Sequence, residues 1–182
     1  ERGGITRQQT TEQVTLVVVP PVSAEQSLRQ KQTDVTTLAS ILRDKALERG
    51  GIRALFTDHD LFGNFTAGSY VFSKRFIEQN PKTVRHFVEA TARAIEWARA
   101  TPREQVIARY EQIVRARGRN EDVSTLRYWR SVGIAGKGGT LSEREFQIWI
   151  DWLTKDGQLE PGAIKAPDVF TNRFNPFADA VR

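Results

Sequence analysis

Four consecutive residues, Thr57 to Asp60, form the most polar cluster in the chain. Two carboxylates beside the imidazole of His59 could ligate a metal ion or arrange a proton transfer. If the segment is extended, however, Asp58 and Asp60 point in opposite directions, which argues against a metal site. The alternatives are a polar loop near a ligand and a solvated turn, where aspartate is common.

A glycine-rich stretch, GIAGKGGT at residues 133–140, invites comparison with a phosphate-binding loop. That motif requires four residues between its first glycine and a Gly-Lys pair, and then Ser or Thr directly after the lysine. In this chain Gly138 follows Lys137, and no predicted strand precedes the stretch. We therefore interpret it as a flexible connection between helices.

The chain offers few groups for catalysis. It has two histidines and no cysteine, which excludes disulfides and thiolate metal sites. His86 lies between apolar positions of a predicted helix, where we expect a half-buried structural residue. No nucleophile-elbow motif and no His-Glu metal motif occurs. We therefore predict a protein that is not an enzyme, with no catalytic residue, no metal and no cofactor.

The distribution of charge argues against a nucleic-acid partner. Lys and Arg number 27 against 22 Asp and Glu, which gives a formal net charge of +5. The two signs are mixed in nearly every segment, whereas nucleic-acid binders concentrate basic residues in a stripe or a recognisable module. The charge therefore supports only a modest attraction for anions.

Residues 12–61 alternate strand and helix patterns, which implies a mostly parallel sheet covered by helices. Ser23 is expected to cap the first helix, and Gly50 with Gly51 is expected to end the second. The three predicted strands are residues 14–19, 33–39 and 52–58.

Residues 62–182 are predicted to be mainly helical, after a possible strand at 65–73. Capping residues and proline mark where each helix should begin. The expected helix starts are Ser73, Asn80 with Pro81, Thr101 with Glu104, and Ser142 with Glu145.

The only repeat is ERGGI, at residues 1–5 and again at 48–52. The second copy is predicted to join the end of a helix to a strand. The first copy has the same ending but no helix before it, and the chain contains no Met. We therefore expect the chain to be part of a longer protein whose N-terminal part is missing.

These elements resemble a known family. Residues 14–42 are similar to the second lobe of periplasmic solute-binding proteins of the nitrate, sulfonate, taurine and bicarbonate type, which serve ABC importers. The family pattern Ala-Leu-x-x-Gly is here Ser27-Leu28-x-x-Lys31, and the following Val-Asp-Ala is Thr33-Asp34-Val35. Residues 65–98 are similar to the crossing back to the first lobe, and the resemblance extends over about residues 12 to 155.

The resemblance implies a type II periplasmic-binding fold, an α/β architecture with two lobes. Residues 1–61 would belong to the second lobe, and residues 62–182 would form the crossing strand and the helical C-terminal return to the first lobe. A periplasmic monomer of this kind binds a small-molecule ligand between its lobes and delivers it to the membrane permease of an ABC importer. The alternative is an enzyme on the same fold, related to proteins that synthesise the pyrimidine precursor of thiamine.

The resemblance also indicates where a solute would bind. In open α/β sheets, ligands bind at the carboxyl ends of the strands. Hydroxyl groups, amides and helix N-termini there suit an anion, but Asp58 and Asp60 would repel one unless they are paired, so a cationic or neutral solute stays open. The residues expected to contact the solute are Pro21, Ser23, Thr36, Thr37, Asp58, His59 and Asn64.

Overall fold

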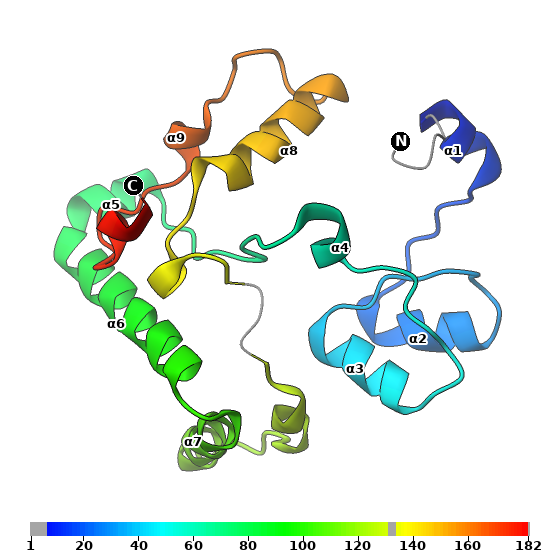
Figure 1. Ribbon diagram of the computed structural model, residues 1–182, viewed down its shortest axis with the longest axis horizontal. Helices are drawn as coiled ribbons and strands as arrows, with labels where there is room; N and C mark the ends of the chain where they lie inside the picture. The colour runs from blue at the N-terminus through cyan, green and yellow to red at the C-terminus, as the bar shows by residue number, and fades with distance from the viewer. Residues whose placement is uncertain (1–6, 131–133, 182) are drawn as a thin grey trace. The chain divides into compact units, whose positions relative to one another are not determined.

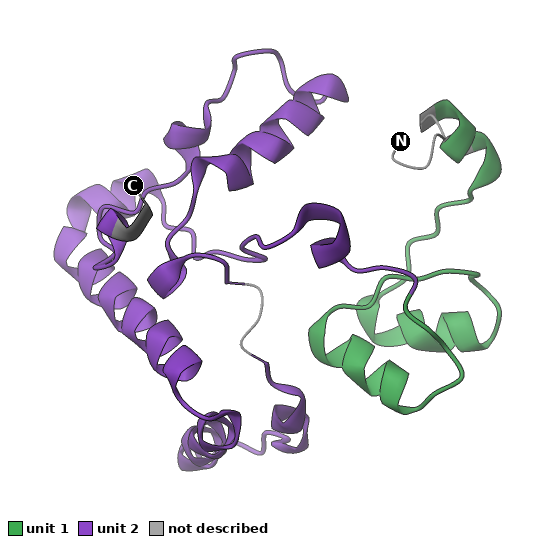
Figure 2. Cartoon of the chain, viewed as in Figure 1, with its two compact units in different colours: residues 1–54 green, residues 55–182 purple. Residues whose placement is uncertain are grey.

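A computed structural model describes residues 7–130 and 134–181 of the chain. The contacts divide the chain into two compact units, residues 1–54 and residues 55–182 (Figure 2). The division into lobes at residues 1–61 and 62–182, which the family resemblance implies, stays a prediction.

The first unit is a set of short helices with a very small core (Figure 1). Helices α2 and α3 pack against each other, and the small side chains Ala24 and Ala46 are buried along with Ser27. The helices of this unit are α1 (Arg7–Gln13), α2 (Pro21–Arg29) and α3 (Ser40–Glu48).

The second unit contains the longer helices and a larger core. Its buried apolar residues are Val84, Ala92, Val106, Ala166 and Phe174. Among residues 7–130 and 134–181, none of the helices has the length and hydropathy that a membrane span requires. The elements are α4 (Asp58–Phe62), α5 (Lys74–Gln79), α6 (Pro81–Ala100), α7 (Arg103–Ala116), η1 (Ser124–Tyr128), η2 (Lys137–Gly139), α8 (Glu143–Lys155), α9 (Ala166–Val169) and η3 (Ala178–Val181).

The predicted α/β fold is wrong for the part of the chain that the structure describes, because every regular element there is helical. The segments expected as strands, residues 14–19, 33–39, 52–58 and 65–73, run as irregular chain apart from short stretches at their ends. A strand is stable only when a neighbouring strand satisfies its backbone, and no such neighbour forms here. Leu16, in the segment expected to be a buried strand, is 88% exposed, and Val71 of the possible strand is 89% exposed.

The helix starts test the capping predictions. Ser73 caps α5, Pro81 begins α6, and Ser142 with Glu145 forms a capping box at α8, all as predicted. Ser23 does not cap α2, because Pro21 already occupies the first turn and the Ser23 hydroxyl donates to the Pro20 carbonyl. The predicted Thr101–Glu104 box is also wrong, since α7 begins one residue later, after Pro102.

The described part of the glycine-rich stretch is firmly held rather than a free connection. We call residues 136–140 the glycine turn; Gly133 lies outside the described residues. The buried Gly138 donates its N–H to Glu96 Oε1 of α6 at 2.6 Å, and its carbonyl accepts from Asn175 Nδ2 at 2.9 Å. Arg99 of α6 donates to the carbonyl of Gly136 at 3.0 Å. The turn therefore joins α6 to the C-terminal segment.

The end of α2 explains one departure from the family pattern. Lys31, which stands where the pattern has glycine, has a positive φ of 58°. Its N–H donates to the Leu28 carbonyl and that of Gln32 donates to the Ser27 carbonyl, the pair of bonds that defines a Schellman motif. This position favours glycine because a Cβ is strained in the left-handed region. The second ERGGI copy ends α3 as predicted, with Gly50 at φ 68°, whereas the first copy lies outside the described residues.

Lys31→Gly is expected to stabilise the chain by about 0.5–1 kcal/mol, because relief of the left-handed strain exceeds the entropy that glycine adds to the unfolded state. Urea unfolding followed by circular dichroism measures the difference. Gln30→Gly is the control: Gln30 has φ −83°, so it gains no relief and should be destabilised. Equal effects of the two substitutions would contradict the assignment.

Gly138→Ala is expected to destabilise the second unit by roughly 3 kcal/mol, because left-handed strain and overpacking add together. A Cβ at Gly138 would lie 2.1 Å from Cδ2 of Phe177. Gly118 has a similar φ of 64° with open space around it, so Gly118→Ala should cost only about 1 kcal/mol for the strain. Chemical denaturation of both variants separates the two contributions, and similar losses would show that Phe177 does not press on the turn.

Candidate functional site

The residues expected to contact a solute fall into two groups. Pro21 and Ser23 lie in the first turn of α2, and Thr36 and Thr37 lie in the irregular chain before α3. Thr36 is half-buried and Thr37 is exposed. These four belong to the first unit, whereas Asp58, His59 and Asn64 belong to the second. Within the second group, His59 and Asn64 are in contact.

The polar cluster at Thr57 to Asp60 is the start of helix α4. The backbone N–H and the hydroxyl of Thr57 donate to Asp60 Oδ2 at 2.7 and 2.8 Å, and the Asp60 N–H donates back to the hydroxyl at 3.2 Å. These bonds from Thr57, helped by nearby His59, hold the pKa of Asp60 below its ordinary value. The Asp60 carboxylate therefore serves as a helix cap.

The cluster has none of the features of a metal centre. Asp58 accepts a hydrogen bond from the His59 backbone at 2.9 Å, so it too is engaged locally. Within residues 7–130 and 134–181, no group of three His, Cys, Asp or Glu side chains is arranged to hold a metal ion. His86, expected to be half-buried, is exposed on α6.

His59 and Asn64 are in contact. Nε2 of His59 lies 3.1 Å from Oδ1 of Asn64. Because a carboxamide oxygen only accepts hydrogen bonds, Nε2 carries the proton in this contact. The Asn64 amide nitrogen is a hydrogen-bond donor.

Asn64 lines a cavity of about 240 Å³, which we call the Asn64 cavity. It joins the loop after α4 to the glycine turn and to the first two turns of α8. The polar side chains that line it are those of Asn64, Lys137, Thr140, Ser142, Arg144 and Glu145, and its apolar wall is built mainly by Phe62, Phe65, Leu141 and Ile148.

Glu145 fixes the wall of the cavity. Its Oε2 accepts from the backbone and the hydroxyl of Ser142 at 2.8 and 2.9 Å, and its Oε1 accepts from the Thr66 N–H at 2.5 Å. Burial raises the pKa of Glu145, but the hydrogen bonds from Ser142 and Thr66 outweigh burial and leave the pKa below its ordinary value. One carboxylate thus caps α8 and ties it to the segment before α5.

The cationic residues of the cavity come from segments that the sequence analysis did not place at the site. Lys137 and Thr140 belong to the glycine-rich stretch, which was set aside because its spacing is wrong for a phosphate loop. In the structure, the described part of the stretch forms a short 3₁₀ turn after irregular chain. Arg144 carried no signal in the sequence beyond its place in the first turn of α8.

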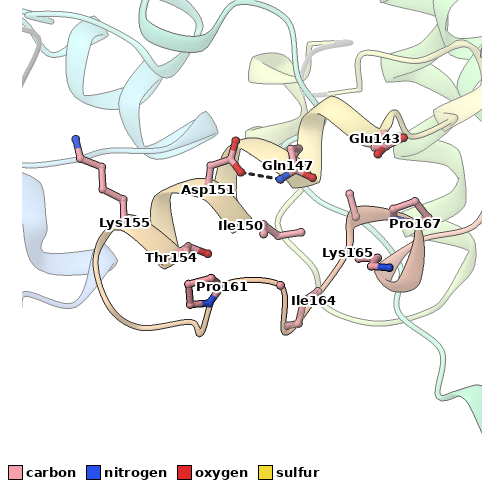
Figure 3. Close-up of a pocket in the computed structure, with 12 residues that line it drawn as sticks. Glu143, Gln147, Ile150, Asp151, Thr154, Lys155, Pro161, Ile164, Lys165 and Pro167 are labelled. Carbon is pink, nitrogen blue, oxygen red and sulfur yellow. Dashed lines mark hydrogen bonds between the residues drawn. The ribbon is translucent and has the colours of Figure 1, made fainter.

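A second cavity, of about 610 Å³, lies between α8 and the segment at residues 161–167; we call it the α8 groove (Figure 3). Asp151 and Gln147 lie together on α8, joined by a hydrogen bond of 2.6 Å. Pro161 and Ile164 come from the segment that faces the helix. The groove carries both signs of charge, and none of the predicted site residues lines it.

Glu145→Gln is expected to destabilise the second unit by about 1–3 kcal/mol at pH 7, because an amide cannot accept all three hydrogen bonds. The lowered pKa means that this contribution is complete above the ordinary glutamate pKa and is lost as the pH falls through the pKa of the folded state. Urea unfolding between pH 3 and 7 should therefore show the two proteins converging at acid pH. Glu143→Gln, an exposed change in the same turn, is the control, and a difference that does not vary with pH would contradict the role of the carboxylate.

Comparison with known proteins gives one match. The model of the family described as NMT1/THI5 like matches residues 4–105, which is more than half of the chain. This family covers nitrate-, sulfonate- and taurine-binding proteins as well as THI5. No curated protein and no solved structure matches the chain. The matched region includes α4, His59 and Asn64. Because the match extends over more than half of the chain, the chain belongs to the NMT1/THI5-like family.

Proposed function

We propose that the chain is a periplasmic solute-binding protein that takes up a small solute and delivers it to the permease of an ABC importer. The observation that carries the proposal is the family match over residues 4–105, since the family includes proteins that bind small solutes. The paucity of catalytic groups in the sequence is consistent with binding rather than turnover.

Between the two cavities, the Asn64 cavity is the better candidate for the solute. Its wall includes residues 62–65, which lie inside the matched region, whereas the α8 groove is built entirely from residues 143–167 outside that region. The Asn64 cavity also contains one of the residues that the sequence placed at the ligand.

The lining of the Asn64 cavity suits a small anion with an apolar part. Arg144 makes no ion pair within the described residues, and Lys137 is 5.2 Å from the Phe177 ring centroid without a carboxylate partner. With the amide of Asn64, these side chains offer donors only, and Phe62 and Phe65 offer apolar contact. Neither Asp58 nor Asp60 lines the cavity. Its one lining carboxylate, Glu145, accepts hydrogen bonds on both oxygens from Ser142 and Thr66, which offset its charge towards an anion.

Thermal unfolding in the presence of candidate solutes tests the proposal. The panel holds nitrate, bicarbonate, taurine, short alkylsulfonates, aromatic acids and pyrimidine precursors of thiamine. A solute that binds the folded state raises the midpoint by mass action. Arg144→Gln is expected to weaken binding of the anion that shifts the midpoint by roughly tenfold, because a charge-assisted contact is lost.

Arg93→Gln is the matched control, because Arg93 is an exposed arginine of α6 that does not line the cavity. It should leave the affinity unchanged. A panel without any shift would contradict solute binding. Turnover of a pyrimidine precursor would instead favour the enzyme alternative, and equal losses in the two arginine variants would move the solute away from the Asn64 cavity.

A further inference from the structure

The side chain of Asn172, in the C-terminal segment, holds both backbone groups of Leu141. The Leu141 N–H donates to Asn172 Oδ1 at 3.0 Å, and Asn172 Nδ2 donates to the Leu141 carbonyl at 2.7 Å. Among the described residues, these are the hydrogen bonds that the N–H and the carbonyl of Leu141 make. Because one planar carboxamide provides both the acceptor and the donor, the two bonds together fix the orientation of this residue's backbone.

Leu141 lies between the two segments that bring cationic side chains to the Asn64 cavity, and it lines that cavity itself. The glycine turn, which carries Lys137, ends at Thr140. The capping box at Ser142 then opens α8, whose first turn carries Arg144. The backbone of Leu141 therefore sets how α8 departs from the glycine turn, and with it the separation of Lys137 from Arg144.

The C-terminal segment that carries Asn172 is itself held in place. The Asn175 N–H donates to the Asn172 carbonyl at 2.8 Å, which closes a turn. The side chain of Phe174, inside this turn, is buried in the core. Asn175 Nδ2 also donates to the carbonyl of Gly138 at 2.9 Å. The segment therefore holds the chain around the cavity at two points, Gly138 and Leu141.

We propose that Asn172 is a positioning residue of the solute site. It does not line the Asn64 cavity, so it acts on a solute through Leu141 and the cationic side chains on either side of Leu141. With both bonds intact, Lys137 and Arg144 are presented at a fixed separation. Without them, the link between the glycine turn and α8 gains freedom, and a solute must order that link before it can contact both cations.

This inference rests on the proposed function, because it assumes that the solute occupies the Asn64 cavity. It adds a residue that neither the family match nor the sequence analysis indicates, since Asn172 lies outside residues 4–105.

Asn172→Leu tests the inference, because leucine has nearly the shape of asparagine and can make neither bond. The probe is the solute from the thermal-unfolding panel that binds the unaltered chain most tightly, and isothermal titration calorimetry measures its affinity. Asn172→Leu should bind the probe roughly three- to tenfold more weakly, with its circular dichroism spectrum unchanged. Asn172→Ala, which leaves room for water to replace the carboxamide, is a second variant that should show the same weakening.

A double-mutant cycle distinguishes positioning from a general loss of stability. If Asn172 acts by placing Arg144, the losses of affinity in Asn172→Leu and Arg144→Gln overlap. The double variant should then bind the probe about as weakly as the weaker of the two single variants. A purely structural effect of Asn172 would instead give a double variant in which the two losses multiply.

Asn80→Ala is the matched control. The Asn80 side chain also donates to a backbone carbonyl, that of Phe76 at 3.3 Å, but it does not line the cavity, so its loss should leave the affinity unchanged. A chain that binds no solute of the panel contradicts the proposed function, and this inference falls with it. If a solute binds, an affinity unchanged in Asn172→Leu, losses that multiply in the cycle, or unfolding of both Asn172 variants overturns the inference alone.

Discussion

The second unit depends on the burial of one peptide unit in the glycine turn. Gly138 is buried with no side chain, so its N–H and carbonyl must find partners inside the protein. Glu96 of α6 supplies the acceptor and Asn175 of the C-terminal segment supplies the donor. Phe177 occupies the space that a Cβ would need. One backbone position thus joins three segments that are distant in the sequence.

The glycine turn also forms part of the wall of the Asn64 cavity. Lys137 and Thr140 face the Asn64 cavity because the turn between them is fixed on α6. Glu145 caps α8 and accepts a hydrogen bond from the backbone of Thr66, which ties the start of α8 to the segment before α5. The backbone of the segments that carry Lys137 and Arg144 is therefore held by hydrogen bonds to α6 and to Glu145.

The first unit is held by a different kind of interaction. Hydrogen bonds from Arg49, and also from Arg29, lower the pKa of Glu25 to about 2, and Arg29 additionally donates to the Ala46 carbonyl of α3 at 3.2 Å. Such exposed ion pairs fix geometry but contribute little stability. The side chains buried in this unit, within the described residues, are the small ones of Ala24, Ser27 and Ala46, so its core is much smaller than that of the second unit.

The sequence by itself determined where α5, α6 and α8 begin and where α3 ends, because caps and prolines act within one turn of chain. Ser73, Pro81 and the Ser142–Glu145 pair were read correctly for that reason, and the failure at Ser23 came from a competing signal, Pro21, in the same turn. It also indicated the family, whereas its assignment of Asn64 to a ligand site stays a prediction. Only the tertiary structure decided the rest. Strand patterns report a tendency, but a sheet needs partners far along the chain, and residues 14–19 and 65–73 find none in the described structure. Likewise, Lys137 and Arg144 line the same cavity as Asn64 because of tertiary contacts such as the hydrogen bond from Gly138 to Glu96 of α6. The spacing of these residues in the sequence does not reveal such contacts.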